Sequence, residues 1–313
     1  MRADKNKKNR ALIEHDYQLI KTAAEKAAAE VLARRHDMDA QGKANDTLFV
    51  HVGESHFSPA EYIFHILLLE RLKAGVGTKI TCGVELDHNY FERDCDEFKH
   101  VKGSLKYAYD ACAHARDHFD GGGASNGRKL FFNYLAAQAQ DKIIRPVFND
   151  AACTVFDEID IGDTLTRSIM RKHGGIVKPF TDTTGREGIY IRNRVMTDML
   201  ADVSIEHGSR IALQFCGVYH VAGGARTYAE ESLSALRIAQ NASFLNIFLC
   251  DLPDEVLECD AQHFVLGAEF PQREADNGRA KINAVLGGDK YTPMPMTERQ
   301  YVGRLKLYIL PQI

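Results

Sequence analysis

A strand–loop–helix–strand pattern near the start of the chain constrains its fold more than any other feature. Residues 48–52 form a short apolar run that stops at Gly53, as a buried parallel strand does. A helical stretch follows, and residues 80–86 then form a second strand-like run. This order is typical of a right-handed βαβ unit, so the sequence predicts an α/β fold.

The helix inside this unit carries start and stop signals. Ser58, Pro59 and Glu61 match a capping box, with serine as the N-cap and proline at the first helical position. Gly75 and Gly77 mark its end.

The rest of the chain continues the alternation. Further strand-like runs lie at 143–148, 211–216, 244–250 and 305–310, and helical patterns lie at about 11–36, 91–142 and 157–205. We therefore predict a predominantly parallel central sheet flanked by helices. The expected organisation is an N-terminal helix over residues 1–40 and a single α/β domain over 41–313, with a helical insertion at about 90–142.

Composition excludes several classes of protein. The chain has 313 residues, of which 45% are apolar and 26% charged, as in soluble globular proteins. Its net charge of −4, with no basic stripe beyond the first ten residues, argues against nucleic acid as a partner. No apolar stretch is long enough for a membrane span. No signal peptide is visible, which predicts a cytoplasmic protein and leaves secretion by a signal-independent route open. The sequence does not indicate an oligomeric state.

Ionisable residues end the expected strands. They are Glu54, His56, Glu85, Asp87, Asp150, His220 and Asp251. Ligands of open parallel sheets bind outside the carboxyl ends of the strands, so these side chains are expected at one crevice. Carboxylates and imidazoles together suit a divalent metal such as Mn, Co or Zn, which would activate water. Without a metal, a histidine beside a carboxylate can act as a general base.

Two of these assignments have simpler alternatives. Arg192 has the planar fork that clamps a carboxylate or phosphate, but its pattern alone favours a solvated helix face. Glu85 is as well explained as the cap of a neighbouring helix. His51 alternates away from the loop and is left outside the site. A serine nucleophile is disfavoured because the chain has no Gly-x-Ser-x-Gly elbow.

Four short motifs resemble the erythromycin esterase, ChaN, TraB and Tiki superfamily. In chain order they comprise Gly53, Glu54 and His56; Glu85; Arg192, Asn193 and Met196; and Gly217, His220 and Gly223. Members of this group hydrolyse a lactone with a water-activating histidine, cleave peptides with a metal, or bind haem.

The resemblance implies that Glu54, His56, Glu85 and His220 form the catalytic or metal-binding set, with Arg192 supporting them. The chain lacks the lipobox cysteine and the membrane anchors of some members. We therefore expect a hydrolase of an ester, lactone or amide bond in a small molecule or peptide, with or without a metal. The alternatives are a haem- or small-ligand-binding protein without catalysis, and a non-catalytic effector or scaffold.

Overall fold

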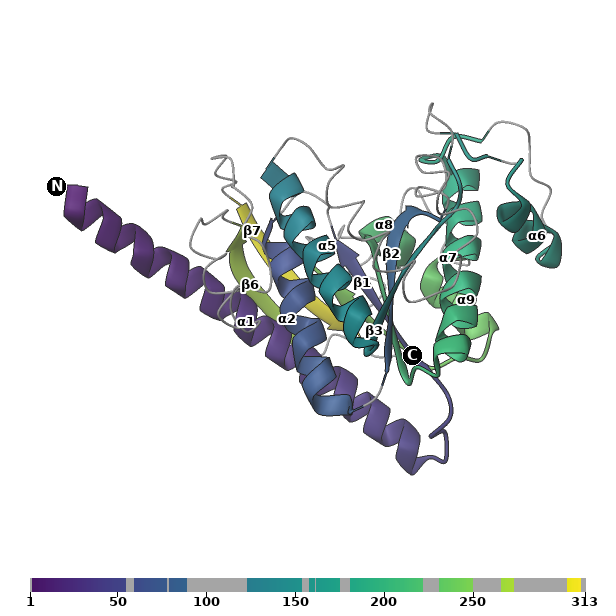
Figure 1. Ribbon diagram of the computed structural model, residues 1–313, viewed down its shortest axis with the longest axis horizontal. Helices are drawn as coiled ribbons and strands as arrows, with labels where there is room; N and C mark the ends of the chain where they lie inside the picture. Colours follow the sequence, from purple (N-terminus) through teal and green to yellow (C-terminus); the bar gives the residue numbers. More distant parts are fainter. Residues whose placement is uncertain are drawn as a thin grey trace.

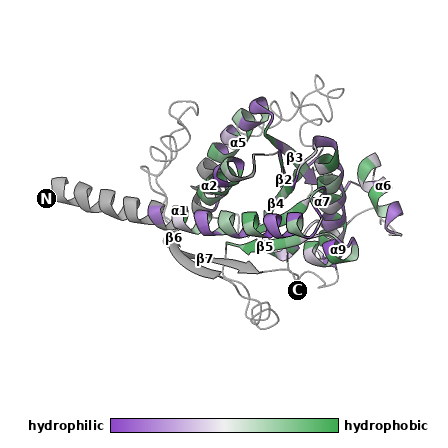
Figure 2. Ribbon diagram, turned by 90° about the horizontal axis from the view of Figure 1, so that it is seen from below, coloured by the Kyte–Doolittle hydropathy of each residue, from purple (hydrophilic) through white to green (hydrophobic). Residues whose placement is uncertain are grey.

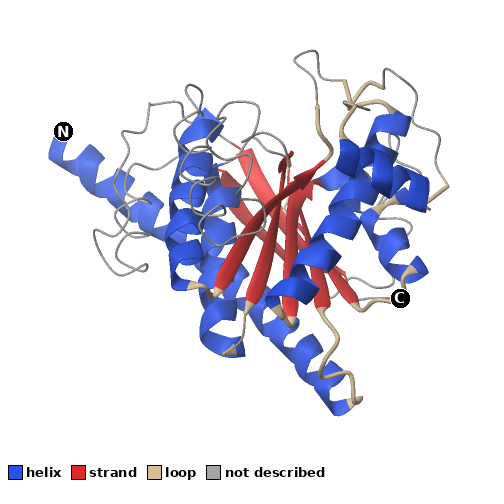
Figure 3. Cartoon of the chain, turned by 45° about the vertical axis from the view of Figure 1, so that its right-hand side comes forward, coloured by secondary structure: helices blue, strands red, loops and turns tan. Residues whose placement is uncertain are grey.

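A seven-stranded sheet with helices on both faces forms the centre of the protein (Figures 1 and 3). The computed structural model describes residues 2–54, 59–77, 79–88, 123–153, 158–160, 162–174, 181–221, 231–249, 266–272 and 303–310. The strands are β1 (Leu48–Glu54), β2 (Ile80–Asp87), β3 (Ile144–Asp150), β4 (Ile211–Gly217), β5 (Phe244–Phe248), β6 (Leu266–Gln272) and β7 (Gly303–Leu310). Their order in the sheet is β3-β2-β4-β1-β5-β7-β6.

The first five strands in that order are parallel, which confirms the predicted α/β fold with a predominantly parallel sheet. Strand β7 pairs antiparallel with β5, and β6 pairs antiparallel with β7. Every expected strand is present. Strand β6 was not predicted, because its segment contains Gly267 and Pro271, two residues that are depleted in strands.

The helices form one layer on each face of the sheet. They are α1 (Arg2–Ala40), α2 (Pro59–Val76), α5 (Gly123–Asp141), α6 (Thr164–Lys172), α7 (Arg186–His207), α8 (Val218–Val221) and α9 (Leu233–Ala239). Helices α1, α2 and α5 share one hydrophobic core with the sheet. Helices α7, α8 and α9 pack on the opposite face, and α6 packs on α7. None of the helices in the described ranges is long and apolar enough to cross a membrane.

Helix α2 lies beside both α5 and α1 in the layer on this face, and small residues allow its close contact with α1. Alanines at positions 23, 24, 27 and 28 are buried along one side of α1. Gly75 of α2 lies close to α1, since a Cβ atom added there would lie 2.6 Å from Leu32 Cδ1. In Figure 2 the central strands are mostly hydrophobic, whereas α1 also carries hydrophilic turns.

Two of the sequence predictions fall partly outside the described residues. Helix α2 begins at Pro59 and ends at Val76, as the capping box and the two glycines predict, but Ser58 lies outside the described residues. Helix α5 is the described part of the helical insertion, and residues 89–122 lie outside it.

Strand order brings three of the predicted motifs to one edge. Strand β4 lies between β1 and β2, and all three are parallel. Their carboxyl ends therefore carry Glu54, Glu85 and Gly217 to the same edge of the sheet, where parallel sheets bind ligands.

Candidate functional site

Glu85 is the centre of the polar cluster at this edge. Its Oε1 lies 3.2 Å from His220 Nε2 and also accepts a hydrogen bond from Arg192 Nη2. Its Oε2 accepts a hydrogen bond of 2.6 Å from the backbone N–H of Gly217, immediately before α8. Glu85 therefore fulfils the predicted capping role, and it also binds two of the predicted site residues.

Arg192 holds two carboxylates from neighbouring strands. Its Nε lies 3.0 Å from Asp150 Oδ1, and its Nη2 lies 2.7 Å from Asp150 Oδ2, the paired geometry that guanidinium and carboxylate groups share. Burial opposes the charge on Arg192, but Asp150 and Glu85 outweigh that effect and raise its pKa. The prediction of a solvated helix face was wrong, because only 14% of this side chain is exposed.

The orientation of His220 is fixed by Asn193. The Asn193 side-chain nitrogen donates to the carbonyl of Glu231 at 2.9 Å, so its oxygen is the atom that faces His220. That oxygen accepts a hydrogen bond of 2.6 Å from His220 Nδ1. The neutral imidazole therefore carries its proton on Nδ1, and the lone pair on Nε2 faces Glu85.

Gly53 explains how α8 comes so close to the sheet. A Cβ atom added at Gly53 would lie 3.2 Å from Val218 Cα and 3.3 Å from Val221 Cγ2. Both contacts involve α8, the short helix that carries His220. The glycine of the first motif thus makes room for the helix of the last motif.

Glu54 lies on the other face of the sheet and pairs with a histidine that the sequence did not single out. His65 Nε2, from α2, lies 3.0 Å from Glu54 Oε2, and both side chains are buried. The His65 ring packs on Phe215 with 4.2 Å between ring centroids. The available signal was one histidine within the otherwise apolar stretch of α2, but a lone histidine of this kind is common in protein cores.

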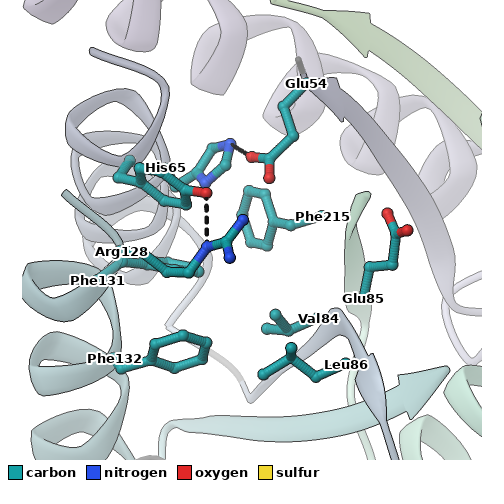
Figure 4. A pocket seen from close by; sticks show the side chains of 10 residues that line it. Glu54, His65, Val84, Glu85, Leu86, Arg128, Phe131, Phe132 and Phe215 are labelled. Carbon is teal, nitrogen blue, oxygen red and sulfur yellow. Dashed lines mark hydrogen bonds and ion pairs between the residues drawn. The ribbon is translucent and has the colours of Figure 1, made fainter. Parts of the chain in front are cut away.

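A cavity of about 220 Å³ lies between α2, α5 and the carboxyl ends of the strands (Figure 4). Both Glu54 and Glu85 line it, together with side chains of α2 and α5. Arg128 of α5 donates from Nε to the Tyr62 hydroxyl at 2.9 Å within this wall. Burial and the nearby charge of Glu54 raise the pKa of Tyr62, so its hydroxyl stays protonated at neutral pH.

The remaining predicted residues have other positions. His56 and Asp251 lie outside the described residues. Asp87 accepts a hydrogen bond of 3.0 Å from the backbone N–H of Cys153 and so anchors the chain after β3. His51 lies away from the cavity, as its alternation predicts, and binds Asn246 of β5.

The described donors do not by themselves fit a metal ion. Within the described ranges, no group of three or more His, Cys, Asp or Glu side chains is placed to hold one. Both oxygens of Glu85 and both ring nitrogens of His220 face protein groups. A divalent ion here would need His56 or a rearrangement of Glu85.

Comparison with known proteins adds one structural similarity. No protein-family model matches the chain, and no curated protein matches it. Among solved structures, the type III effector HopBA1 is similar, with 16% sequence identity and a TM-score of 0.29. That similarity covers 58% of this chain and 71% of HopBA1.

Proposed function

We propose that the protein is a hydrolase of an ester, lactone or amide bond, in which His220 acts as the general base. The observation that carries this proposal is the arrangement of His220 between Asn193 and Glu85. Asn193 keeps the proton on Nδ1, so Nε2 can accept a proton from water. Glu85, 3.2 Å from Nε2, stabilises the imidazolium that this transfer creates.

Because Nε2 faces Glu85 in this structure, the reaction needs a water molecule to enter between these two groups and a substrate carbonyl within reach of that water. As the water oxygen bonds to the carbonyl carbon, its proton moves to His220 Nε2. The tetrahedral intermediate then collapses, the bond to the leaving group breaks, and the same proton passes to the leaving oxygen or nitrogen. Arg192 fixes Glu85 and Asp150 throughout, so it acts as a positioning residue.

Turnover of 4-nitrophenyl acetate, a small lactone and a peptide mixture tests the proposal. His220→Ala should lower kcat/KM by about 100-fold or more, because general-base catalysis contributes roughly 10²–10⁴-fold. His36→Ala, which changes an exposed histidine of α1, is the matched control and should leave turnover unchanged. Full activity in folded His220→Ala protein would overturn the assignment.

Two further measurements separate the alternatives. A stoichiometric Mn, Co or Zn ion that is lost in both His56→Ala and His220→Ala would favour metal-assisted hydrolysis. A Soret band on haem titration, abolished in His220→Ala and accompanied by no turnover, would favour a ligand-binding protein instead.

A further inference from the structure

The cavity beside Glu54 and Glu85 has aromatic walls on several sides. Its rings come from two helices and one strand: Tyr62 of α2, Phe131 and Phe132 of α5, and Phe215 of β4. Phe131 and Phe215 meet edge to face, with 5.4 Å between centroids and an angle of 79° between the ring planes. Val84 and Leu86 of β2 lie on the opposite side of the cavity from Arg128 in Figure 4. Such walls favour a flat apolar group.

Each carboxylate that lines the cavity lies close to a basic side chain. Glu54 lies 3.0 Å from His65, and the positive charge of Arg128 lies close enough to Glu54 and Glu85 for both to raise its pKa, against the effect of burial. Glu85 is also bound by Arg192. A charged ligand would therefore have to compete with these internal partners and would also lose its own water on entry.

The volume limits the size of the ligand. An apolar cavity of roughly 150 Å³ holds benzene, and sites for drug-sized ligands span about 300–1,000 Å³. At about 220 Å³, this cavity has room for one substituted ring.

We propose that the cavity binds an uncharged, ring-sized apolar group of the substrate, such as an aryl or cyclohexyl group, attached to the carbonyl that is cleaved. This inference rests on the proposed hydrolase function. Glu85 both lines the cavity and lies 3.2 Å from His220. A ring seated among the phenylalanines thus directs its carbonyl towards the Glu85 end, beside the general base.

Probe binding tests the cavity without requiring turnover. Saturation-transfer NMR should show that benzyl alcohol binds wild-type protein, and that phenylacetate and benzylamine bind at least tenfold more weakly. Leu86→Trp, which fills the cavity, should weaken the binding of benzyl alcohol at least tenfold. The smaller change Leu86→Phe should weaken it less. Ile238→Trp is the control, because Ile238 is 58% exposed on α9. Equal or tighter binding of either charged probe, or undiminished binding in folded Leu86→Trp protein, would overturn the proposal.

A kinetic comparison separates this proposal from the hydrolase assignment. The ratio of kcat/KM for 4-nitrophenyl phenylacetate to that for 4-nitrophenyl acetate should exceed ten in wild type and fall towards one in Leu86→Trp. Benzyl alcohol should still bind His220→Ala. Probe binding without any ester turnover would refute the hydrolase assignment but support the cavity as a binding site. Ester turnover that depends on His220, without probe binding, would refute ring binding in the cavity but support the hydrolase assignment.

Discussion

His220 and Asn193 are joined by a hydrogen bond of 2.6 Å whose direction is set by the Glu231 carbonyl on the far side of the amide. We predict that neutral His220 carries its proton on Nδ1, although the Nε2–H form is usually preferred by free imidazole side chains. The ¹⁵N shifts of the ring in a long-range ¹H–¹⁵N spectrum report this tautomer directly. In Asn193→Ala the Nε2–H form should become the major one.

The same pair predicts the effect of a change that keeps an acceptor beside the ring. Asn193→Asp loses the amide nitrogen that donates to Glu231, but an oxygen can still accept from His220 Nδ1. The Nδ1–H form should therefore persist in Asn193→Asp and be lost in Asn193→Ala. Unchanged ring shifts in Asn193→Ala would show that Asn193 does not orient His220.

Arg192 should contribute strongly to stability, because it is the shared partner of two largely buried carboxylates. Removing one partner of a buried ion pair costs about 3–5 kcal/mol. We expect Arg192→Met to lower the free energy of unfolding by that amount at pH 7 in urea titrations. Arg192→Lys keeps the charge but loses the paired hydrogen bonds to Asp150. Its free energy of unfolding should therefore lie between those of wild type and Arg192→Met.

The control for Arg192 is an exposed ion pair. Arg71 and Glu25 form such a pair, with side chains 47% and 42% exposed. Arg71→Met should change the free energy of unfolding by less than about 1 kcal/mol. Similar losses in the two variants would mean that the Arg192 cluster is no more important for stability than a surface pair.

Gly53→Ala should impair turnover more than stability. The added methyl group would meet α8 at 3.2 Å and displace the helix that carries His220 by a few tenths of an ångström. Overpacking costs about 1–3 kcal/mol, and the lower entropy of the unfolded chain offsets about 0.4–1 kcal/mol. We expect kcat/KM to fall at least tenfold. Gly185→Ala, whose nearest contact would be 3.4 Å, should leave kcat/KM within a factor of two.

Local patterns were sufficient to predict every described strand except β6, and the ends at which polar residues collect. Residues 48–52 are apolar at every position except His51, because β1 is buried on both faces. The four-motif resemblance also selected Glu85, Arg192 and His220, which the structure brings into contact. Their roles in catalysis remain predictions.

The partners within the site depend on contacts between distant segments. Alternation along β1 directs Glu54 to the face covered by α2, so it meets His65 instead of the Glu85 cluster. Asp150 was predicted only as a residue at the end of a strand, because nothing local shows that β3 lies beside β2 or that Asp150 binds Arg192. Arg128 and Tyr62 gave no signal at all, because each resembles an ordinary helix residue until α2 and α5 are packed together.

His51 predicts how stability depends on pH. Burial, followed by the charge of Arg237, lowers its pKa to about 3 and outweighs the hydrogen bond that His51 donates to Asn246. In the unfolded chain the pKa is near 6.5. Between these values the unfolded state binds a proton that the folded state does not bind, so this residue destabilises the fold as pH falls from about 6.5 towards 3.

His51→Gln removes that group while an amide N–H can still reach Asn246, whose Oδ1 lies 2.9 Å from His51 Nδ1. The free energy of unfolding, measured in urea, should fall with decreasing pH in both proteins, but less steeply in the variant. Below pH 6 the two slopes should differ by up to about 1.4 kcal/mol per pH unit. Other groups cancel in this comparison, including His88, whose pKa is raised and whose contribution has the opposite sign. His36→Gln, at an exposed position, should follow the wild-type curve. Parallel curves for wild type and His51→Gln between pH 7 and pH 5 would show that His51 is protonated in the folded protein, and the neutral Asn246 pair described above would then be wrong.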